Sequence, residues 1–531
     1  MRAITFVTRT AVIAFGLMSL AGVQSVQAQE GQALVNARCG SCHAAKADGS
    51  RFRISEARKT PEAWDMTLVR MMIVHGVKLT PADRRKLVKH LADTQGLAPS
   101  ETKGYRYILE KTPGVTDKGP TEQLTQTCGR CHSYARAALQ RRDKADWLKL
   151  VHFHLGQYPT TEYQALGRDR DWWGIARTKV VDALAKRQPF TTDAWTAWKK
   201  RKTPNLAGTW RVVGHQPGRG DYEGTLTVAS KGKDTYSVTT RLNYVGGAKV
   251  ERKGNAILYT GHEWRAGTRG QDGRARQVMS VSADGKTMRG RWFYRNNDVI
   301  GGTLTAVRVK GAGAQVLAVS PGYVKRGGGM KITISGTKLG VDLNLGEGLS
   351  ARVLEKRPDA IIVQISASAK APLGARTVKV GGASLADSLV VYDKVAAVKI
   401  VPGQTMARVG GNRGPIPRVP AQFEAVAYMA GPDGKAGTKD DVRIGVMPAT
   451  WKVDNFDDGA KAMKDATFAG RITQRGLFNP AGAGPNPKRR MGTNNAGNLS
   501  VIGTVSDGGT KVSGKAQLFV TVQRFVDPPI R

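Results

Sequence analysis

The sequence reads CGSCHAAKADG over residues 39–49 and CGRCHSYARAA over residues 128–138. These two stretches contain all 4 cysteines of the 531-residue chain. Each begins with C-x-x-C-H, in which two thiols attach haem covalently through its vinyl groups and the histidine ligates the iron. We therefore predict two covalently bound c haems. The residues predicted to hold them are Cys39, Cys42 and His43 in the first unit and Cys128, Cys131 and His132 in the second.

The N-terminus predicts export. Arg2 and Arg9 precede an apolar run over residues 11–23, and small residues follow up to Ala28. This pattern is typical of a secretory signal peptide covering residues 1–28, so we expect a periplasmic protein. The apolar run is short for a membrane span, and no later stretch reaches about 18 apolar residues, so we expect no membrane span.

An oxidising compartment offers another use for the cysteines. A Cys39–Cys42 disulfide would be compatible with the periplasm, and two zinc half-sites would be a further alternative. A redox C-x-x-C pair, however, needs no histidine after it, and here His43 and His132 follow both pairs. Two such coincidences behind a secretion signal favour haem attachment.

The first iron needs a sixth ligand or keeps an open position. Apolar residues recur at helical spacing from Trp64 to Met72. A second helix is expected to begin with Thr80 as its N-cap and Pro81 at its first position. We predict Met72 as the sixth ligand of this iron, with Met71 and His75 as alternates. The competing interpretation is that the methionines fill the core around the porphyrin.

The second iron has a different set of candidates. The next methionine after Met72 is Met279, far along the chain, whereas ADWLKLVHFHLGQYP supplies His152 and His154. Aligning the tryptophans of the two units places Met72 over His154, while aligning their glycines favours His152. We therefore predict His154, with His152 as the alternate. Histidine in place of methionine lowers a haem potential, so the two haems should differ in potential.

The hydrophobic period divides the chain into domains. It is helical up to about residue 200 and alternating, with frequent turns, after residue 205. The fold class expected is an N-terminal all-α dihaem cytochrome c domain followed by three all-β domains. VLAVSPGYVKRGGGMKITISGTKL resembles the first strands of IPT/TIG immunoglobulin-like domains. The expected divisions are 29–200 for the dihaem domain, 205–310 for an antiparallel barrel or sandwich, 314–393 for the IPT/TIG-like domain, and 394–531 for an Ig-like sandwich.

Other polar residues give weaker patterns. Asp433, Asp440 and Asp441 lie in a glycine-rich stretch that could hold Ca²⁺, but their spacing does not match an EF-hand. We favour a solvated hairpin there. His215 and His262 have no partners at metal-ligand spacing, so surface or packing roles are expected.

The chain is strongly basic. It carries 82 Lys and Arg against 42 Asp and Glu, a formal net charge of +40. These charges are spread along the whole chain, and no helix-turn-helix, zinc-finger or RNA-binding signature accompanies them. We therefore expect no nucleic-acid partner. Acidic protein partners would suit this charge.

The order of these domains resembles the α subunit of quinohaemoprotein amine dehydrogenase over the full chain. CGSCH, CGRCH and HFHLGQYPTTEYQAL carry the resemblance most specifically. It implies an αβγ heterotrimer in which a small γ subunit bears a cysteine tryptophylquinone and a propeller-shaped β subunit helps to enclose it. The quinone oxidises a primary amine to an aldehyde and ammonia. Electrons then pass through the α-subunit haems to a soluble carrier such as a blue copper protein or a cytochrome c.

This resemblance implies an enzyme subunit without catalytic residues of its own for amine oxidation. All 4 cysteines are assigned to haem attachment, so none remains to form such a quinone here. Other classes of function stay open from sequence. The chain could be a stand-alone periplasmic dihaem carrier, the redox subunit of another periplasmic dehydrogenase, or an assembly protein whose β domains bind a partner.

Overall fold

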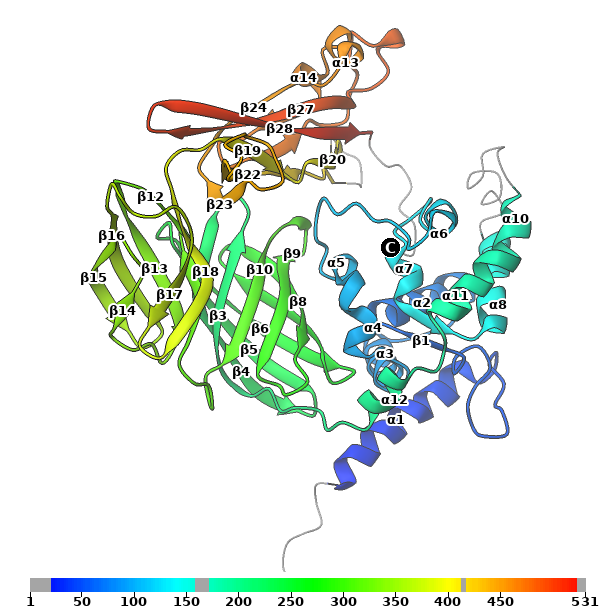
Figure 1. Ribbon diagram of the computed structural model, residues 1–531. Helices are drawn as coiled ribbons and strands as arrows, with labels where there is room; N and C mark the ends of the chain where they lie inside the picture. Colours follow the sequence, from blue (N-terminus) through cyan, green and yellow to red (C-terminus); the bar gives the residue numbers. More distant parts are fainter. Residues whose placement is uncertain (1–20, 158–170, 412–416, 523–531) are drawn as a thin grey trace, which may run out of the picture.

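The computed structural model describes residues 21–157, 171–411 and 417–522 (Figure 1). A helical N-terminal domain lies beside a β-barrel, a third domain flanks the barrel on its other side, and the last β domain lies above the barrel. Most of the predicted signal peptide lies outside the described residues. Helix α1 (Ala21–Cys39) runs through the predicted cleavage position to the first C-x-x-C-H motif. Within the described ranges, no helix is both long and apolar enough to cross a membrane.

The N-terminal domain is built from helices with threonine caps. The predicted cap at Thr80 is confirmed, because its hydroxyl accepts a hydrogen bond from the Asp83 amide at 3.0 Å and Pro81 begins the helix. Thr60 caps the preceding helix in the same way. The helices after α1 are α2 (Pro61–Val74), α3 (Pro81–Thr94), α4 (Pro99–Thr102), α5 (Arg106–Leu109), α6 (Glu122–Thr127), α7 (Ala135–Ala138), α8 (Lys144–Gln157), α10 (Trp172–Ile175), α11 (Val181–Arg187) and α12 (Asp193–Lys199).

The expectation of an all-α N-terminal domain is wrong. Strand β1 (Ala57–Lys59) pairs antiparallel with β2 (Gln140–Arg142) and so joins the two motif units through the middle of the domain. Long irregular stretches also separate its short helices, and the chain as a whole contains more strand than helix. The fold is therefore mostly β, with a partly helical N-terminal region.

Two buried arginines explain why the sequence pattern did not predict these strands. Arg58 donates two hydrogen bonds to the Glu101 carboxylate, at 2.9 and 2.8 Å, and Arg141 donates a third at 3.1 Å. Basic residues in a three-residue segment are typical of exposed loops. Here the Glu101 carboxylate compensates both guanidinium charges, so the strands can lie inside the domain.

Residues 208–308 form a closed eight-stranded barrel in which every neighbouring pair is antiparallel. Trp210, Trp264 and Trp292 are fully buried in its interior. A hairpin turn at Gly285 joins β8 and β9, and its φ of +68° needs glycine or strain. The strands are β3 (Gly208–Gln216), β4 (Gly220–Gly232), β5 (Thr235–Tyr244), β6 (Lys249–Tyr259), β7 (Glu263–Gly270), β8 (Gly273–Val281), β9 (Thr287–Tyr294) and β10 (Asn297–Arg308).

Ion pairs attach the barrel to the N-terminal domain. Arg265 of β7 pairs with Glu62 at the start of α2, and Arg106 pairs with Glu263 at 2.5 Å. His262 is buried beside Trp198, with ring centroids 5.1 Å apart, which is the packing role expected for it. The Arg265–Glu62 pair holds the N-terminal end of α2, whereas Met71 and Met72 lie near its C-terminal end.

The third domain consists of two four-stranded sheets around one core. Its outermost strand, β15, is exposed along most of its length. The strands are β11 (Gln315–Ser320), β12 (Tyr323–Lys325), β13 (Gly329–Thr337), β14 (Leu343–Asn344), β15 (Leu349–Arg357), β16 (Ala360–Ala367), β17 (Gly374–Val380) and β18 (Ala383–Tyr392).

The last domain has three sheets around a separate core. The aspartates considered for Ca²⁺ lie in its exposed loop before β23, where Asp440 accepts a hydrogen bond from Thr438 at 2.6 Å and Asp441 accepts one from the Gly437 amide at 2.9 Å. The elements are β19 (Ala397–Val401), β20 (Gln404–Arg408), β21 (Ala421–Gln422), β22 (Glu424–Met429), β23 (Val442–Met447), β24 (Thr450–Asn455), α13 (Asp458–Ala462), α14 (Asp465–Phe468), β25 (Gly470–Ile472), β26 (Leu477–Pro480), β27 (Gly497–Asp507) and β28 (Thr510–Thr521).

Candidate haem sites

The first motif forms a tight turn at the end of α1. The His43 amide donates to the Cys39 carbonyl at 2.9 Å, and the Cys42 amide donates to the same oxygen at 3.3 Å. Both cysteines are free thiols, and burial raises the pKa of Cys39. The turn therefore presents two unbonded thiols and an imidazole close together, as haem attachment requires.

The His43 ring is oriented by its backbone neighbours. Its Nδ1 lies 2.9 Å from the Phe52 carbonyl oxygen, so Nδ1 carries the proton and donates it there. This assignment leaves Nε2 unprotonated and able to ligate a metal. Arg51 donates to the His43 carbonyl at 2.8 Å and holds the loop in place.

The second motif begins directly after α6. Cys128 and Cys131 are free thiols, and burial raises the pKa of Cys128 to about 11. The Nδ1 atom of His132 lies 3.0 Å from the Ser133 carbonyl oxygen, which again frees Nε2 for a metal. Burial also lowers the pKa of His132, which favours the neutral imidazole that a metal needs.

Helix α8 brings His154 to the second motif. The ring centroids of His132 and His154 are 6.4 Å apart, and the rings are inclined by 40°. The Nδ1 atom of His154 lies 2.8 Å from the Leu150 carbonyl oxygen, so its Nε2 is also free. His132 and His154 are therefore close enough that they would hold the iron of a haem attached at this motif.

His152 does not share this arrangement. It is exposed, and its ring packs edge-on against Trp173 with centroids 4.9 Å apart. Of the two histidines predicted as alternatives, the structure brings His154 to His132 and directs His152 elsewhere. The alignment that matched Trp64 with Trp147 gives this same choice.

The last turn of α2 supplies the candidates for the first iron. Met71 and Met72 are half-buried, and the His75 amide caps the helix by donating to the Met71 carbonyl at 3.2 Å. The described residues show no ring contact between His43 and His75. The choice among these three candidates thus stays a prediction, with Met72 first.

Exposed apolar side chains mark the first unit. Ile73 and Val74, beside Met72, are 58% and 45% exposed, and Phe52, whose carbonyl holds His43, is 48% exposed. Such a group of apolar side chains normally lies against another apolar surface. A porphyrin held by the first motif would supply one.

The two units contact each other through α2. The Arg70 guanidinium lies 4.4 Å from the Phe153 ring centroid, and Arg136 lies 3.6 Å from the Met66 sulfur. Arg70 precedes the methionines of the first unit, and Phe153 precedes His154 of the second. The candidate sixth ligands thus lie on two helices that contact each other through Arg70 and Phe153.

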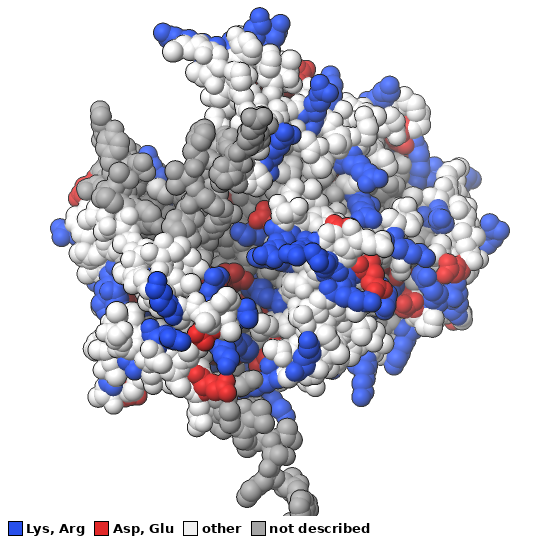
Figure 2. All heavy atoms as spheres, turned by 180° about the vertical axis from the view of Figure 1, so that it is seen from behind, with Lys and Arg blue, Asp and Glu red and all other residues white. Residues whose placement is uncertain are grey.

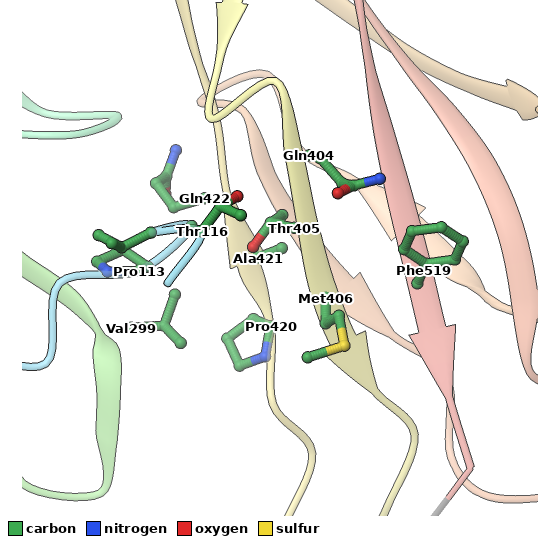
Figure 3. A pocket seen from close by; sticks show the side chains of 12 residues that line it. Pro113, Thr116, Val299, Gln404, Thr405, Met406, Pro420, Ala421, Gln422 and Phe519 are labelled. Carbon is green, nitrogen blue, oxygen red and sulfur yellow. The ribbon is translucent and has the colours of Figure 1, made fainter. Parts of the chain in front are cut away.

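A cavity of about 420 Å³ lies outside both units (Figure 3). It is formed where the loop after α5 meets the barrel and the last domain, and no charged side chain lines it. Its lining includes Pro113, Thr116, Val299, Met406, Gln422 and Phe519. Among the described residues, no group of three or more His, Cys, Asp or Glu could hold a metal ion.

The solved structures that match this chain have low sequence identity and low TM-scores. A redesigned β barrel, mFAP1, bound to DFHBI is 15% identical, and the match covers 19% of this chain and 94% of that one, with a TM-score of 0.17. Mouse clustered PcdhgC3 EC1-3 is 10% identical over 46% of this chain and 86% of that one, with the same TM-score. Scores this low carry no argument. A search of curated proteins finds no match.

Family models match nearly the whole chain in four consecutive segments. Residues 29–195 match the haem-binding domain described as quinohemoprotein amine dehydrogenase A, alpha subunit, haem binding. Residues 203–309, 313–393 and 398–530 match domains II, III and IV of the same alpha subunit. All four domains are present in the order of the subunit, and the first contains both C-x-x-C-H motifs. The chain belongs to the quinohemoprotein amine dehydrogenase alpha subunit family, the haem-binding subunit of an oxidoreductase complex.

Proposed function

We propose that this chain carries electrons through two covalently attached c haems in a periplasmic amine dehydrogenase. Electrons would come from a quinone on a partner γ subunit, in a heterotrimer with a β subunit, and leave to a soluble blue copper protein or cytochrome c. The observation that carries the proposal is the pairing of His132 with His154 beside two free thiols.

The residues of the chain would bind and orient the haems. Cys39 and Cys42 would anchor the first haem and Cys128 and Cys131 the second, while His43 and His132 would ligate the irons from their freed Nε2 atoms. The backbone carbonyls that accept from each Nδ1 fix the ring orientation and raise the basicity of the ligating nitrogen. Bound haem supplies reversible one-electron transfer at iron.

The sixth ligands would set the difference in potential. His154 is proposed for the second iron and Met72 for the first. A thioether raises and an imidazole lowers the potential, so the two centres would form a directional pair. Helix α2 and helix α8 would hold these ligands at a fixed separation, because Arg70 and Phe153 pack between them.

The surface charge supports acidic partners. On the face seen in Figure 2, Lys and Arg are spread over most of the visible surface, whereas Asp and Glu form a few smaller groups. With a net charge of +40, long-range attraction would steer an acidic carrier or subunit toward the chain.

The proposal is tested by purifying the protein from its native host and adding a primary amine. Co-purifying β and γ chains, together with haem absorption that changes to the reduced form on amine addition, are expected. A lone chain whose haems stay oxidised with every primary amine tried would contradict the role and favour a stand-alone carrier.

A further inference from the structure

A lysine side chain is buried inside the N-terminal domain. Lys59, the last residue of β1, is 6% exposed. Its Nζ donates to the Thr67 hydroxyl at 3.0 Å and lies 4.6 Å from the Trp64 ring centroid. Among the described residues, no carboxylate lies within ion-pair distance of this Nζ. A buried ammonium with one neutral hydrogen bond is costly, because burial removes its hydration.

The neighbours of Lys59 add positive charge. Arg53, Arg70 and Arg142 are its strongest electrostatic neighbours, and burial together with these three holds the pKa of Lys59 well below its usual range. Burial and two of the same arginines lower the pKa of Arg142 to about 9. The Asp146 carboxylate pairs with Arg142 and lies 3.9 Å from Arg53. Asp143 and Glu56 are further electrostatic neighbours of Arg142, whereas no carboxylate is a strong electrostatic neighbour of Lys59.

This cluster lies between the proposed haem units. Thr67, the partner of Lys59, is one helical turn before Met71 on α2. On the other side, Arg70 contacts Phe153, and Arg70, Arg136 and Arg142 are electrostatic neighbours of the His154 imidazole. Strands β1 and β2, which carry Lys59 and Arg142, join the two units. An anion bound here would contact both halves of the domain.

The proposed function supplies such an anion, because each haem carries two propionate carboxylates. We propose that Lys59, supported by Arg70 and Arg142, binds a haem propionate at the junction of the two haem units. The inference rests on the proposed presence of haem. Charge-assisted hydrogen bonds from buried cations to a carboxylate are about 2.7–2.9 Å long and are stronger than neutral ones. The propionate would satisfy the ammonium, and the ammonium would fix that edge of the porphyrin.

The pairing has a consequence for electron transfer. A positive charge held beside the porphyrin favours the reduced iron, which carries one charge less, and therefore raises the potential of that haem. Lys59 is thus a positioning and tuning residue. Either haem could provide the propionate, and the haem whose potential depends on Lys59 identifies the source.

The experiment uses the intact haem-loaded complex with Lys59→Met, Lys59→Arg and a control, Lys86→Met. Methionine retains length and removes charge, arginine retains charge, and Lys86 is an exposed lysine of α3, with 63% of its side chain accessible. The potential of each haem is measured by spectroelectrochemical titration, and propionate bending bands are recorded by resonance Raman spectroscopy.

Lys59→Met is expected to lower the potential of one haem so that its reduction equilibrium changes about tenfold, equivalent to about 59 mV for one electron. The propionate band of that haem should shift, while Lys59→Arg and Lys86→Met should resemble the unaltered protein. Unchanged potentials and bands with both haems attached would overturn this inference and leave the proposed function standing. A chain without two haems would overturn both.

A second measurement covers the case in which Lys59→Met does not fold. In a crystal structure of the unaltered haem-loaded complex, a propionate oxygen should lie about 3 Å from the Lys59 Nζ. Both propionates of each haem pointing away from Lys59 would overturn the inference.

Discussion

The imidazole rings of His132 and His154 lie with their centroids 6.4 Å apart and their planes inclined by 40°, although the residues belong to a loop and to a separate helix. Each ring is held through Nδ1 by a backbone carbonyl, so both Nε2 atoms are available. His132 and His154 would hold the iron of the second haem, and this proximity distinguishes His154 from His152 two residues earlier.

Replacing His154 by alanine should open the second iron. Without the imidazole, one axial position becomes available to carbon monoxide in the reduced protein, which changes the absorption spectrum of that haem. The potential of that haem should also change, because its axial ligand set changes. Carbon monoxide difference spectra of the purified complex provide the measurement.

His152→Ala is the matched control for this variant. His152 is exposed and packs on Trp173, so its removal should leave the second haem closed to carbon monoxide. If His152→Ala opens the iron and His154→Ala leaves it closed, the assignment of the sixth ligand is wrong.

Glu101→Gln should destabilise the N-terminal domain. The substitution leaves the buried Arg58 and Arg141 without their shared carboxylate, which typically costs about 3–5 kcal/mol of unfolding free energy. Denaturant unfolding followed by tryptophan fluorescence measures the loss. Glu122→Gln, at an exposed position of α6, is the control and should change the unfolding free energy by less than about 0.5 kcal/mol.

The same carboxylate predicts sensitivity to acid. Burial alone would raise the pKa of Glu101, but the hydrogen bond from Arg58 and the charge of Arg141 outweigh it and hold the pKa below the ordinary 4.5. A lowered pKa contributes stability above 4.5 that is lost as the pH falls through the folded-state value. The stability difference between the unaltered protein and Glu101→Gln should therefore shrink in acid, and a difference independent of pH would contradict the ion pair.

His215 should couple the barrel to the last domain in a pH-dependent way. Its Nδ1 bonds Asp221 at 2.6 Å and its Nε2 bonds Glu424 at 2.7 Å. Burial opposes the charged form, but these two carboxylates raise the pKa of His215 to about 10. A raised pKa gives stability that is complete below the ordinary 6.5 and is lost as the pH rises toward about 10.

His215→Asn tests this coupling. Thermal unfolding should show the largest loss of stability below the ordinary pKa of 6.5 and a smaller loss as the pH rises toward about 10, where the unaltered His215 also loses its charge. An equal loss at all pH values would show that the imidazolium contributes nothing beyond shape.

Electron delivery to an acidic carrier should weaken with salt. A chain of net charge +40 attracts acidic partners at long range, and ions at physiological strength screen charges beyond about 8 Å. Stopped-flow reoxidation of the reduced haems by an acidic carrier should therefore be slower at physiological than at low ionic strength. A rate independent of salt would remove the electrostatic part of the account.

Local features of the sequence predicted local features of the structure well. The Thr80 cap depends on a few adjacent residues whose conformational preferences are strong. The choice of His154 over His152 stays a prediction, which the proximity of the His154 and His132 rings supports.

Features that depend on distant residues were missed. Strands β1 and β2 have three residues each, too few to show an alternating pattern, and they are stabilised by Glu101 from another segment. The buried position of Lys59 could not be read from its own neighbourhood either, since a lysine beside a helix cap is normally exposed. The sequence did not decide the sixth ligand of the first iron, because Met71, Met72 and His75 all lie at the same end of one helix.

The number of covalently bound haems tests the central claim most directly. After acid-acetone extraction, which removes non-covalent haem, the intact mass of the mature chain should exceed the mass of its polypeptide by two haems. Cys39→Ala should lose the haem of the first unit, and Cys128→Ala should lose the haem of the second unit. A mass that corresponds to one haem, to none, or to a Cys39–Cys42 disulfide would contradict the account.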